Sequence, residues 1–414
     1  MASDLNSLAL LVTAAITAGN TALLYRQSRR HESLLKSIPI RIHINGTRGK
    51  STVTRLIAAG LRAGGIRTIA KTTGTSPRII LEDGSECMII RRNGASIGEQ
   101  IHAIEFAAGR NAQAVVLECM AVNPEYQWIC EHKIIKSGIG VITNVRMDHT
   151  DLMGSSLRQI ASCLANTIPQ NGTLVTAETR CLETLKSRAE QLGTTVCRVE
   201  PSGVSDQEIS EFSYPSFKDN ISVALSVCGL LGIDRTTALS GMHAALPDPG
   251  VLQVCKAVFG QKEVVFINAL AANDVASTRQ LWDAAVLGAG SAQKALLFCS
   301  RKERSARNAE FVSAMTSGWN FDMLILAGEG TTAIRRRLLA RKIQPSRIVD
   351  LGMLNIDAIP DRILSCLSEE SMVFAAGNII GIGEAVADYF YKRGTDEPVC
   401  ADIIHRAYNI SRPV

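Results

Sequence analysis

The sequence predicts an α/β fold: a central P-loop domain with a mostly parallel sheet, a smaller Rossmann-like C-terminal α/β domain, and an apolar helix at the N-terminus. Three observations predict this class. The 414 residues are 46% hydrophobic and 5% aromatic with 32 glycines, as in an enzyme rich in aliphatic strands and glycine turns. Short aliphatic segments alternate with helical patterns, which indicates parallel sheets covered on both faces. A glycine-punctuated turn follows the first of these segments.

The first strand is expected over residues 38–44, where β-branched residues alternate with other side chains. A helix is expected over residues 51–63, because Leu56, Ile57 and Leu61 recur at helical spacing, and a second apolar segment covers residues 68–71. Further strands are expected at residues 114–118, 139–144, 173–176, 263–268, 295–299, 323–326, 347–351 and 372–376.

The chain is expected to have three parts. Residues 1–30 form an N-terminal anchor helix, residues 31–250 the phosphate-loop domain, and residues 251–414 a C-terminal α/β domain for substrate. The boundary is placed after the Pro-Asp-Pro-Gly sequence that ends at Gly250, because this rigid, turn-prone segment is typical of a linker.

The N-terminal segment from Leu5 to Tyr25 contains no charged residue, and Arg26, Arg29 and Arg30 follow it. A helix of this length reaches about 32 Å, enough to cross a hydrocarbon core. The arginines then predict a cytoplasmic position for the rest of the chain, at the inner face of the membrane. The alternative is a helix that packs against a partner, since several polar residues interrupt the segment.

The cysteines and charges exclude other classes of protein. The 11 cysteines include no Cys-x-x-Cys pair, which argues for reduced thiols in the cytosol and against a disulfide framework or a zinc site. The formal net charge is +5 with no long basic block, so no nucleic-acid partner is expected.

The turn after the first strand has the composition of a phosphate-binding loop. Its glycines allow backbone N–H groups to converge on phosphate oxygens, and the following helix N-terminus adds partial positive charge. Lys50 is expected against the β- and γ-phosphates, and the Ser51 hydroxyl is expected to ligate Mg²⁺. The longer Walker pattern fails, because Ile44 replaces its first glycine. The loop residues are Gly46, Thr47, Arg48, Gly49, Lys50, Ser51 and Thr52.

Three further polar groups follow expected strands. Thr72 and Thr73 precede a glycine turn and are candidates to hold a substrate carboxylate or a metal-bound water, or they form an ordinary turn. Glu118 ends an apolar strand, where open α/β sheets bind ligands, and would suit a nucleotide's Mg²⁺. His149 lies between Asp148 and Asp151 in a strand-end loop and is a candidate metal ligand.

In order, these motifs resemble the ATP-dependent Mur ligase superfamily, which includes murein peptide ligases and folylpolyglutamate synthases. A finer resemblance is to the CapB/PgsB family, the ligase subunit of poly-γ-glutamate synthase, and it runs over nearly the whole chain. The motifs that carry it are Lys71-Thr-Thr-Gly-Thr, Ile97-Gly-Glu-Gln, Glu118-Cys-Met-Ala-Val-Asn-Pro, Asp219-Asn220, the Pro-Asp-Pro-Gly linker and Gly377-Asn378.

The resemblance implies roles for individual residues. It implies that the phosphate loop binds ATP with Mg²⁺, or Mn²⁺, and that Asn220 contacts adenine; a helix N-cap is the alternative for Asn220. The catalytic group is expected to be Lys50, Glu118, His149 and Arg48. The metal ligands are expected to be Ser51, Glu118, His149 and Thr73. The substrate contacts, the least certain set, are expected to be Thr72, Thr73, Asn273, Asp274, Arg301, Arg304 and Asn378.

Two departures from the superfamily pattern stand out. A lysine that is carbamylated to hold a second metal in murein ligases and folylpolyglutamate synthases corresponds here to Leu164. The second metal is therefore expected to be held by another group or more weakly. Only about 40 residues precede the phosphate loop, which leaves no room for a UDP-sugar domain, so a murein substrate is disfavoured.

The expected activity is polymerisation of glutamate through γ-linkages by way of an acyl phosphate. The expected partners are glutamate, the growing poly-γ-glutamate chain, small integral membrane subunits and further copies of the chain. One alternative is a soluble folylpolyglutamate-type ligase that adds glutamate tails. Another is a nucleotide-gated assembly protein that hydrolyses ATP without making an amide.

Overall fold

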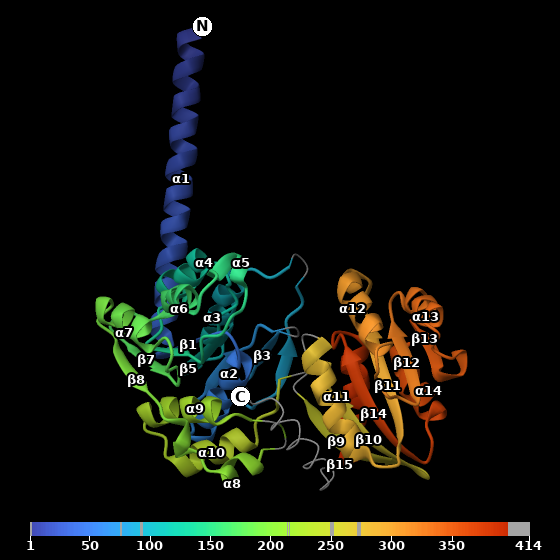
Figure 1. Cartoon of the computed structure of the whole chain (residues 1–414). Coiled ribbons are helices and arrows are strands. Elements are labelled where there is room, and N and C mark those ends of the chain that lie inside the picture. The colour runs from blue at the N-terminus through green and yellow to red at the C-terminus, as the bar shows by residue number, and fades with distance from the viewer. Residues whose placement is uncertain are drawn as a thin grey trace. The chain divides into compact units, whose positions relative to one another are not determined.

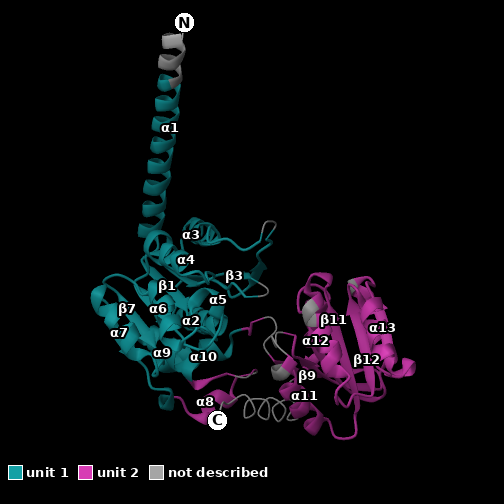
Figure 2. Ribbon diagram, turned by 45° about the horizontal axis from the view of Figure 1, so that its top comes forward, with its two compact units in different colours: residues 1–203, 219–245 teal, residues 204–218, 246–414 magenta. Residues whose placement is uncertain are grey.

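The computed structural model describes residues 2–395 apart from 75–76, 92–93, 213, 215, 249–251 and 271–274. The chain divides into two compact units (Figures 1 and 2). Unit 1 comprises residues 1–203 and 219–245, and unit 2 comprises residues 204–218 and 246–414. The domain boundary predicted at residue 250 stays a prediction, because it falls outside the described residues.

Unit 1 is built on an eight-stranded sheet with the order β4-β3-β2-β5-β1-β6-β7-β8. The strands from β2 to β8 in this order run parallel, and β3 and β4 join as antiparallel edge strands. The strands are β1 Ile40–Asn45, β2 Thr68–Lys71, β3 Arg78–Ile80, β4 Glu86–Met88, β5 Ala114–Glu118, β6 Ile139–Ile142, β7 Thr173–Thr176 and β8 Thr195–Arg198.

Helices connect these strands because parallel neighbours require crossover connections. The helix after β1 buries its apolar side chains against the sheet, and Gly64 and Gly65 end it. The helices are α1 Ala2–Ser37, α2 Lys50–Ala63, α3 Glu99–Gly109, α4 Pro124–Ile129, α5 Thr150–Met153, α6 Leu157–Leu164, α7 Leu182–Gln191, α9 Lys218–Leu230 and α10 Arg235–His243, with a π-helix at Cys130–Ile135.

The N-terminal helix α1 is one continuous helix that extends beyond the rest of unit 1 (Figure 1). Only the last turns are anchored: Leu35 is buried, and His31 Nε2 lies 2.7 Å from the Ile134 carbonyl oxygen. Among the described residues, we find no helix that is both long enough and apolar enough to cross a membrane. The predicted membrane anchor is therefore not confirmed.

Unit 2 contains a seven-stranded sheet with the order β13-β12-β11-β14-β10-β9-β15. In this sheet β9 pairs antiparallel with both β10 and β15, and the other neighbouring strands pair parallel. Two largely parallel sheets confirm the predicted α/β class. The elements are α8 Asp206–Ser210, β9 Gln253–Phe259, β10 Lys262–Asn268, α11 Val275–Ala289, β11 Gln293–Ser300, α12 Ser305–Met315, β12 Met323–Gly328, α13 Thr331–Ala340, β13 Ile348–Gly352, α14 Ile359–Cys366, β14 Glu370–Gly377, α15 Ile382–Tyr391 and β15 Gly394–Thr395.

The two faces of the unit 2 sheet carry separate cores. One core joins Trp282 of α11, Phe311 of α12 and Leu338 of α13 to inward side chains of the strands. The other joins Ile363 of α14 and Phe390 of α15 to the opposite face. Layers on both faces are what the near-continuous apolar strands of this half require.

A buried pair of charged side chains joins β1 to the π-helix. The π-helix turns Glu131 inward, where its carboxylate lies 2.8 Å from His43 Nδ1 and accepts hydrogen bonds from the Ser137 backbone and hydroxyl. Burial disfavours the imidazolium, but hydrogen bonds with Cys119 and Glu131 outweigh this effect and raise the pKa of His43 to about 9. The pair therefore ties β1 to the π-helix as an ion pair at neutral pH.

This pair predicts a pH-dependent stability. Because the folded-state pKa lies above the ordinary value of 6.5, the contribution is complete below that pH and disappears as the pH rises towards 9. We expect the urea midpoint of the unfolding of unit 1 to fall over this interval, and to fall less in His43→Asn. The control is His102→Asn, whose side chain is 81% exposed, and which should follow the wild type. Parallel pH profiles for wild type and His43→Asn would contradict the assignment.

Candidate functional site

The carboxyl ends of four neighbouring strands lie together in unit 1. Ile44 of β1 is in register with Glu118 of β5, and Lys71 of β2 with Leu117. On the other side, Asn45 pairs with Ile142 of β6. The segments that follow β2, β5, β1 and β6 therefore begin at one edge of the sheet, which is where parallel α/β sheets bind ligands.

The phosphate loop after β1 is held by the segment after β6. The Thr47 N–H donates to the Asn144 carbonyl oxygen at 3.0 Å, and the Arg48 N–H donates to Asn144 Oδ1 at 3.1 Å. The Arg48 carbonyl oxygen accepts hydrogen bonds from Thr143 Oγ1 and Asn144 Nδ2 at 2.7 and 2.9 Å. This reciprocal set fixes the loop backbone.

Two glycines of the loop are required by their surroundings. Gly46 has a φ of +128°, and a Cβ there would lie 2.1 Å from Thr143 Oγ1. Gly49 has a φ of +81°, and a Cβ there would lie 2.7 Å from Asn220 Oδ1. The chain therefore needs glycine at both positions to keep the loop against β6 and α9.

The start of α2 offers donors for an anion. Gly49 precedes the helix in a left-handed conformation, and no side chain among the described residues caps the first turn. The N–H groups at the start of a helix carry partial positive charge and bind phosphate groups. Lys50 Nζ donates to the carbonyl oxygens of Gly46 and Thr47 at 2.8 and 3.2 Å, so its ammonium lies over the same loop.

Glu118 joins three of the converging segments. Its carboxylate Oε2 accepts hydrogen bonds from Ser51 Oγ at 2.9 Å and from the Thr73 N–H at 2.8 Å. The residue is only 3% exposed, and its carbonyl oxygen accepts from Gln100 Nε2 at 2.8 Å. A carboxylate and a hydroxyl are the hard oxygen donors that Mg²⁺ prefers, so this pair fits a divalent cation beside the phosphate loop.

A buried ion-pair network, which sequence reasoning missed, supports this carboxylate from the β2 side. Lys71 Nζ lies 3.2 Å from Glu99 Oε2, and Arg91 Nε lies 2.7 Å from Glu99 Oε1. Arg91 also reaches the Thr73 carbonyl oxygen with both terminal nitrogens at 3.4 Å. Arg91 thereby holds the carbonyl of Thr73, whose N–H donates to Glu118. Lys71 and Glu99 both lie in motifs that carried the family resemblance, which was the available signal.

Burial controls the charges of this network. It lowers the pKa of Lys71, whose side chain is 1% exposed, although Glu99 opposes the change. Burial also acts against ionised Glu99, but hydrogen bonds from Arg91 and the charge of Lys71 outweigh it and lower the pKa of Glu99. Beside the network, Thr72 Oγ1 and Gln100 Oε1 are buried without a hydrogen-bond partner among the described residues. These two atoms can still bind water or substrate.

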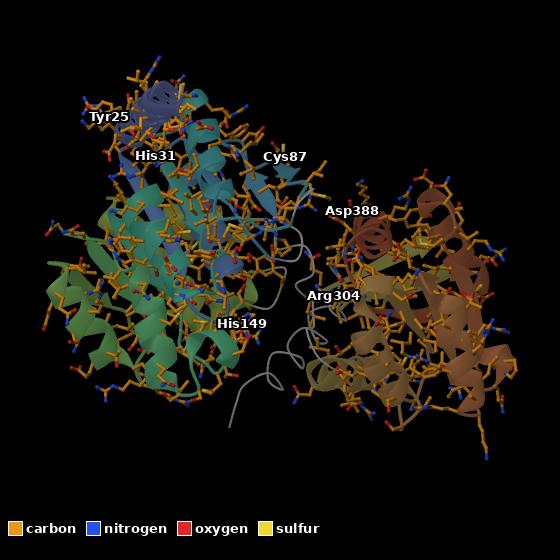
Figure 3. The ribbon with its side chains drawn as sticks, turned by 90° about the horizontal axis from the view of Figure 1, so that it is seen from above. Tyr25, His31, Cys87, His149, Arg304 and Asp388 are labelled. Carbon is orange, nitrogen blue, oxygen red and sulfur yellow. The ribbon has the colours of Figure 1, made fainter. Side chains whose placement is uncertain are left out.

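The His149 loop does not join this group. His149 has a φ of +44° and an exposed side chain (labelled in Figure 3), with Nε2 4.0 Å from Asp148 Oδ1. Arg48 also faces this loop, with a terminal nitrogen 3.6 Å from Asp148 Oδ2. The described part of the chain contains no group of three or more His, Cys, Asp or Glu side chains that could hold a metal ion. The expected second metal site and the role of His149 stay predictions.

Leu164 occupies the position at which the superfamily pattern has a lysine, and its surroundings are apolar. It is 1% exposed and packs with Ile142, Val145 and Ile160 in the core of unit 1. A charged or carbamylated side chain has no place there.

Asn220 lies close to the phosphate loop. It begins the buried part of α9, and its amide covers Gly49, as the clash of a Cβ at that glycine shows. Burial raises the pKa of the neighbouring Asp219, against the opposing charge of Arg146. The predicted contact of Asn220 with adenine stays a prediction.

Three of the predicted substrate residues of unit 2 lie after β11 and β14, which are neighbours in the sheet, and their role stays a prediction. Arg301 lies 3.1 Å from Glu303, and Arg304 is exposed (Figure 3). Asn378 is buried, and its N–H and Nδ2 donate to the Cys299 carbonyl oxygen at 2.8 and 3.3 Å. It thereby joins the ends of β11 and β14. Asn273 and Asp274 lie outside the described residues.

The network predicts a specific effect of Glu99→Gln. This change leaves Lys71 charged and buried, so we expect a loss of about 3 kcal/mol in the stability of unit 1, at the lower end for a broken buried pair. We also expect a higher Mg²⁺ concentration for half-maximal nucleotide binding, because Thr73 and Glu118 lose their support. Urea unfolding and calorimetric titration measure the two effects.

The matched control is Glu105→Gln on the same helix, where the carboxylate is 36% exposed and faces Arg30 at 3.6 Å. It should change stability by less than about 1 kcal/mol, as surface ion pairs do. Equal effects of the two substitutions would show that the buried network has no special role.

Comparison with known proteins identifies the family. Residues 44–245 match the Mur ligase middle domain, and residues 254–393 match the poly-gamma-glutamate synthase CapB C-terminal domain. The chain is 36% identical over 369 residues to PGA synthase CapB of Bacillus subtilis (strain 168), which covers 88% of this chain and 94% of that protein. It is 37% identical over 365 residues to the capsule biosynthesis protein CapB of Bacillus anthracis, covering 87% and 78%.

A solved structure shares the fold. The bifunctional folylpolyglutamate synthase/dihydrofolate synthase of Yersinia pestis, complexed with AMPPNP and Mn ion, superposes with a TM-score of 0.56. The sequence identity is 17%, and the match covers 88% of this chain and 92% of that one. The two domain models and the two relatives show that the chain belongs to the CapB family of poly-γ-glutamate synthases, within the Mur ligase superfamily.

Proposed function

We propose that this protein is an ATP-dependent, ADP-forming amide ligase that polymerises glutamate through its γ-carboxylate. The observation that carries the proposal is the contact of Glu118 with Ser51 directly beside the phosphate loop. A buried carboxylate and a hydroxyl at the start of a helix, next to Lys50, form a site for the phosphates and metal of a nucleotide. The similarity to the poly-gamma-glutamate synthase CapB C-terminal domain and to PGA synthase CapB of Bacillus subtilis supports glutamate as the substrate.

Amide formation from a free carboxylate is unfavourable in water, so the carboxylate is first activated. A γ-carboxylate oxygen attacks the γ-phosphorus of ATP, the bond to ADP breaks, and an acyl phosphate forms. The amine of a second glutamate then attacks the acyl carbon. The bond to phosphate breaks, and the amine releases a proton as phosphate leaves. Such steps depend chiefly on positioning and on charge stabilisation.

Lys50, Ser51 and Arg48 of the loop each have a role in this scheme. The first-turn N–H groups of α2 bind the phosphates, and Lys50 neutralises charge on the β- and γ-phosphates. Ser51 and Glu118 would hold Mg²⁺ or Mn²⁺, which supplies Lewis-acid stabilisation of the phosphate charge when bound. Arg48, which extends from the loop towards Asp148, is proposed to contact the transferring group or the substrate carboxylate.

The second expected metal is not part of this proposal. The buried position of Leu164 and the exposure of His149 do not support it. His149 is instead proposed to approach the acyl phosphate, which needs only that its exposed ring reach the substrate from the loop after β6.

The exposed apolar side chains of α1 support a proposal about the location and partners of the enzyme. Its exposed side chains include Leu11, Ile16 and Leu23, and an apolar surface of this kind requires a partner. We therefore propose a position at the cytoplasmic face of the membrane, in a complex with small integral membrane subunits and further copies of the chain. A polyanionic product must leave the cell, so a synthase beside an exporter is a sensible arrangement.

The first test is Lys50→Ala. Removal of this cation should lower glutamate-dependent ADP release by at least about 10²-fold, comparable to the loss of one oxyanion donor. Lys186→Ala, on exposed α7 and paired with Glu183 at 3.0 Å, is the matched control and should retain full activity. Near-normal activity of Lys50→Ala would contradict the assignment of the loop.

The products separate this proposal from its alternatives. A γ-glutamate ligase yields a polymer that resists α-peptide proteases, with one ADP for each residue added. A folate-tailing ligase would extend an added folate, and a nucleotide-gated assembly protein would hydrolyse ATP at a rate indifferent to glutamate. Membranes or purified chain incubated with Mg-ATP and labelled glutamate distinguish these outcomes.

A further inference from the structure

A basic ridge runs along α13 and the turn that follows it in unit 2. Residues 330–347 contain six arginine and lysine residues and no aspartate or glutamate. Ile334 and Leu338 are buried in the core of unit 2, so the helix has one apolar face and one basic face. The ridge is defined by Arg335, Arg336, Arg337, Arg341, Lys342 and Arg347.

The charges of the ridge are not neutralised within the described part of unit 2. The side chains of Arg335, Arg336, Arg337 and Lys342 form no ion pair or hydrogen bond among the described residues, and all but that of Arg335 are exposed. Other exposed arginines of the chain do pair, as Arg279 does with Asp283 at 2.8 Å.

The two remaining arginines are held by neutral groups. Arg341 Nη1 donates to Ser313 Oγ at 3.0 Å and to Thr316 Oγ1 at 3.1 Å. Arg347 lies 4.8 Å above the ring of Phe321 and donates to its carbonyl oxygen. These contacts fix the positions of the two side chains and leave their charges uncompensated.

The acidic residues nearest in sequence are engaged elsewhere. Glu329 Oε2 accepts the Lys302 N–H at 3.0 Å, and Asp350 Oδ1 accepts the Gly352 N–H at 3.1 Å. Asp322 Oδ2 accepts the Lys294 N–H at 2.8 Å. The carboxylates that could have paired with the ridge therefore bind backbone donors.

We propose that this ridge binds the growing poly-γ-glutamate chain and retains it between additions. The inference rests on the proposed function, because only that product supplies a polyanion with one free α-carboxylate in every residue. Guanidinium groups bind carboxylates through parallel hydrogen bonds, and several weak contacts to one chain add up. Retention then grows with chain length and falls with salt.

An anionic membrane surface is the competing occupant, and the structure favours the polymer. A helix that lies in a membrane interface inserts an apolar face between the lipids. In α13 the apolar residues Ile334 and Leu338 are buried in the unit 2 core, so its outward face carries arginines, with small side chains between them and no exposed large apolar residue. A flexible polyanion needs no more than that.

The test uses the full chain and Arg336→Glu/Arg337→Glu, two exposed positions outside the proposed catalytic machinery. The binding of fluorescent poly-γ-glutamate of about 20 residues should weaken by at least about tenfold at low salt, because opposite charges now face the polymer. Arg336→Lys/Arg337→Lys should retain most of the binding. Glutamate-dependent ADP release should be unchanged, and the product should be shorter.

The matched control is Arg67→Glu/Arg158→Glu, which makes the same change in net charge at two exposed positions of unit 1. Unaltered polymer binding by the α13 variant, or an equal loss in the control, overturns the inference. So does a wild-type chain whose ridge binds phosphatidylglycerol vesicles and not the polymer. Absence of glutamate-dependent ADP release in the wild type would instead overturn the proposed function, so the two failures are distinguishable.

Discussion

The buried carboxylate of Glu118 is the group on which the site depends. It lies at the end of β5 between two neighbours, and one oxygen accepts hydrogen bonds from both Ser51 and Thr73. A carboxylate that is 3% exposed needs compensation for its lost hydration, and these donors supply part of it. A divalent cation would supply the rest. The same atom thus connects the start of α2, the end of β2 and the chemistry of phosphate transfer.

The parallel sheets could be predicted from sequence because their central strands are short, aliphatic and separated by helical segments. The strands at Ala114–Glu118 and Thr173–Thr176 were predicted to the residue, and the others to within a few residues. The elements that were missed, β3, β4, β8, β9 and β15, lie at or near the sheet edges and include polar or exposed side chains. Antiparallel edge strands depend on tertiary pairing more than on an apolar run, so local patterns do not reveal them.

The candidate site was partly visible in the sequence for a similar reason. Glycines, a lysine and hydroxyls directly after a strand indicate a phosphate loop. Glu118 is the last residue of the neighbouring strand β5. The support of these groups comes from distant segments. Glu99 at the start of α3 pairs with both Lys71 and Arg91, Asn144 binds the loop backbone, and Asn220 covers Gly49. Such contacts depend on register and on helix placement, which a single sequence does not specify.

The central claim is that the loop around Lys50 binds a triphosphate whose metal sits on Ser51 and Glu118. A crystal structure of the chain with Mg²⁺ and a non-hydrolysable ATP analogue tests it most directly. The account predicts the β- and γ-phosphates against the first turn of α2 and the cation within about 2.1 Å of Ser51 Oγ, with Glu118 bound to it directly or through water. Nucleotide bound elsewhere, with the Ser51–Glu118 hydrogen bond intact, would contradict it.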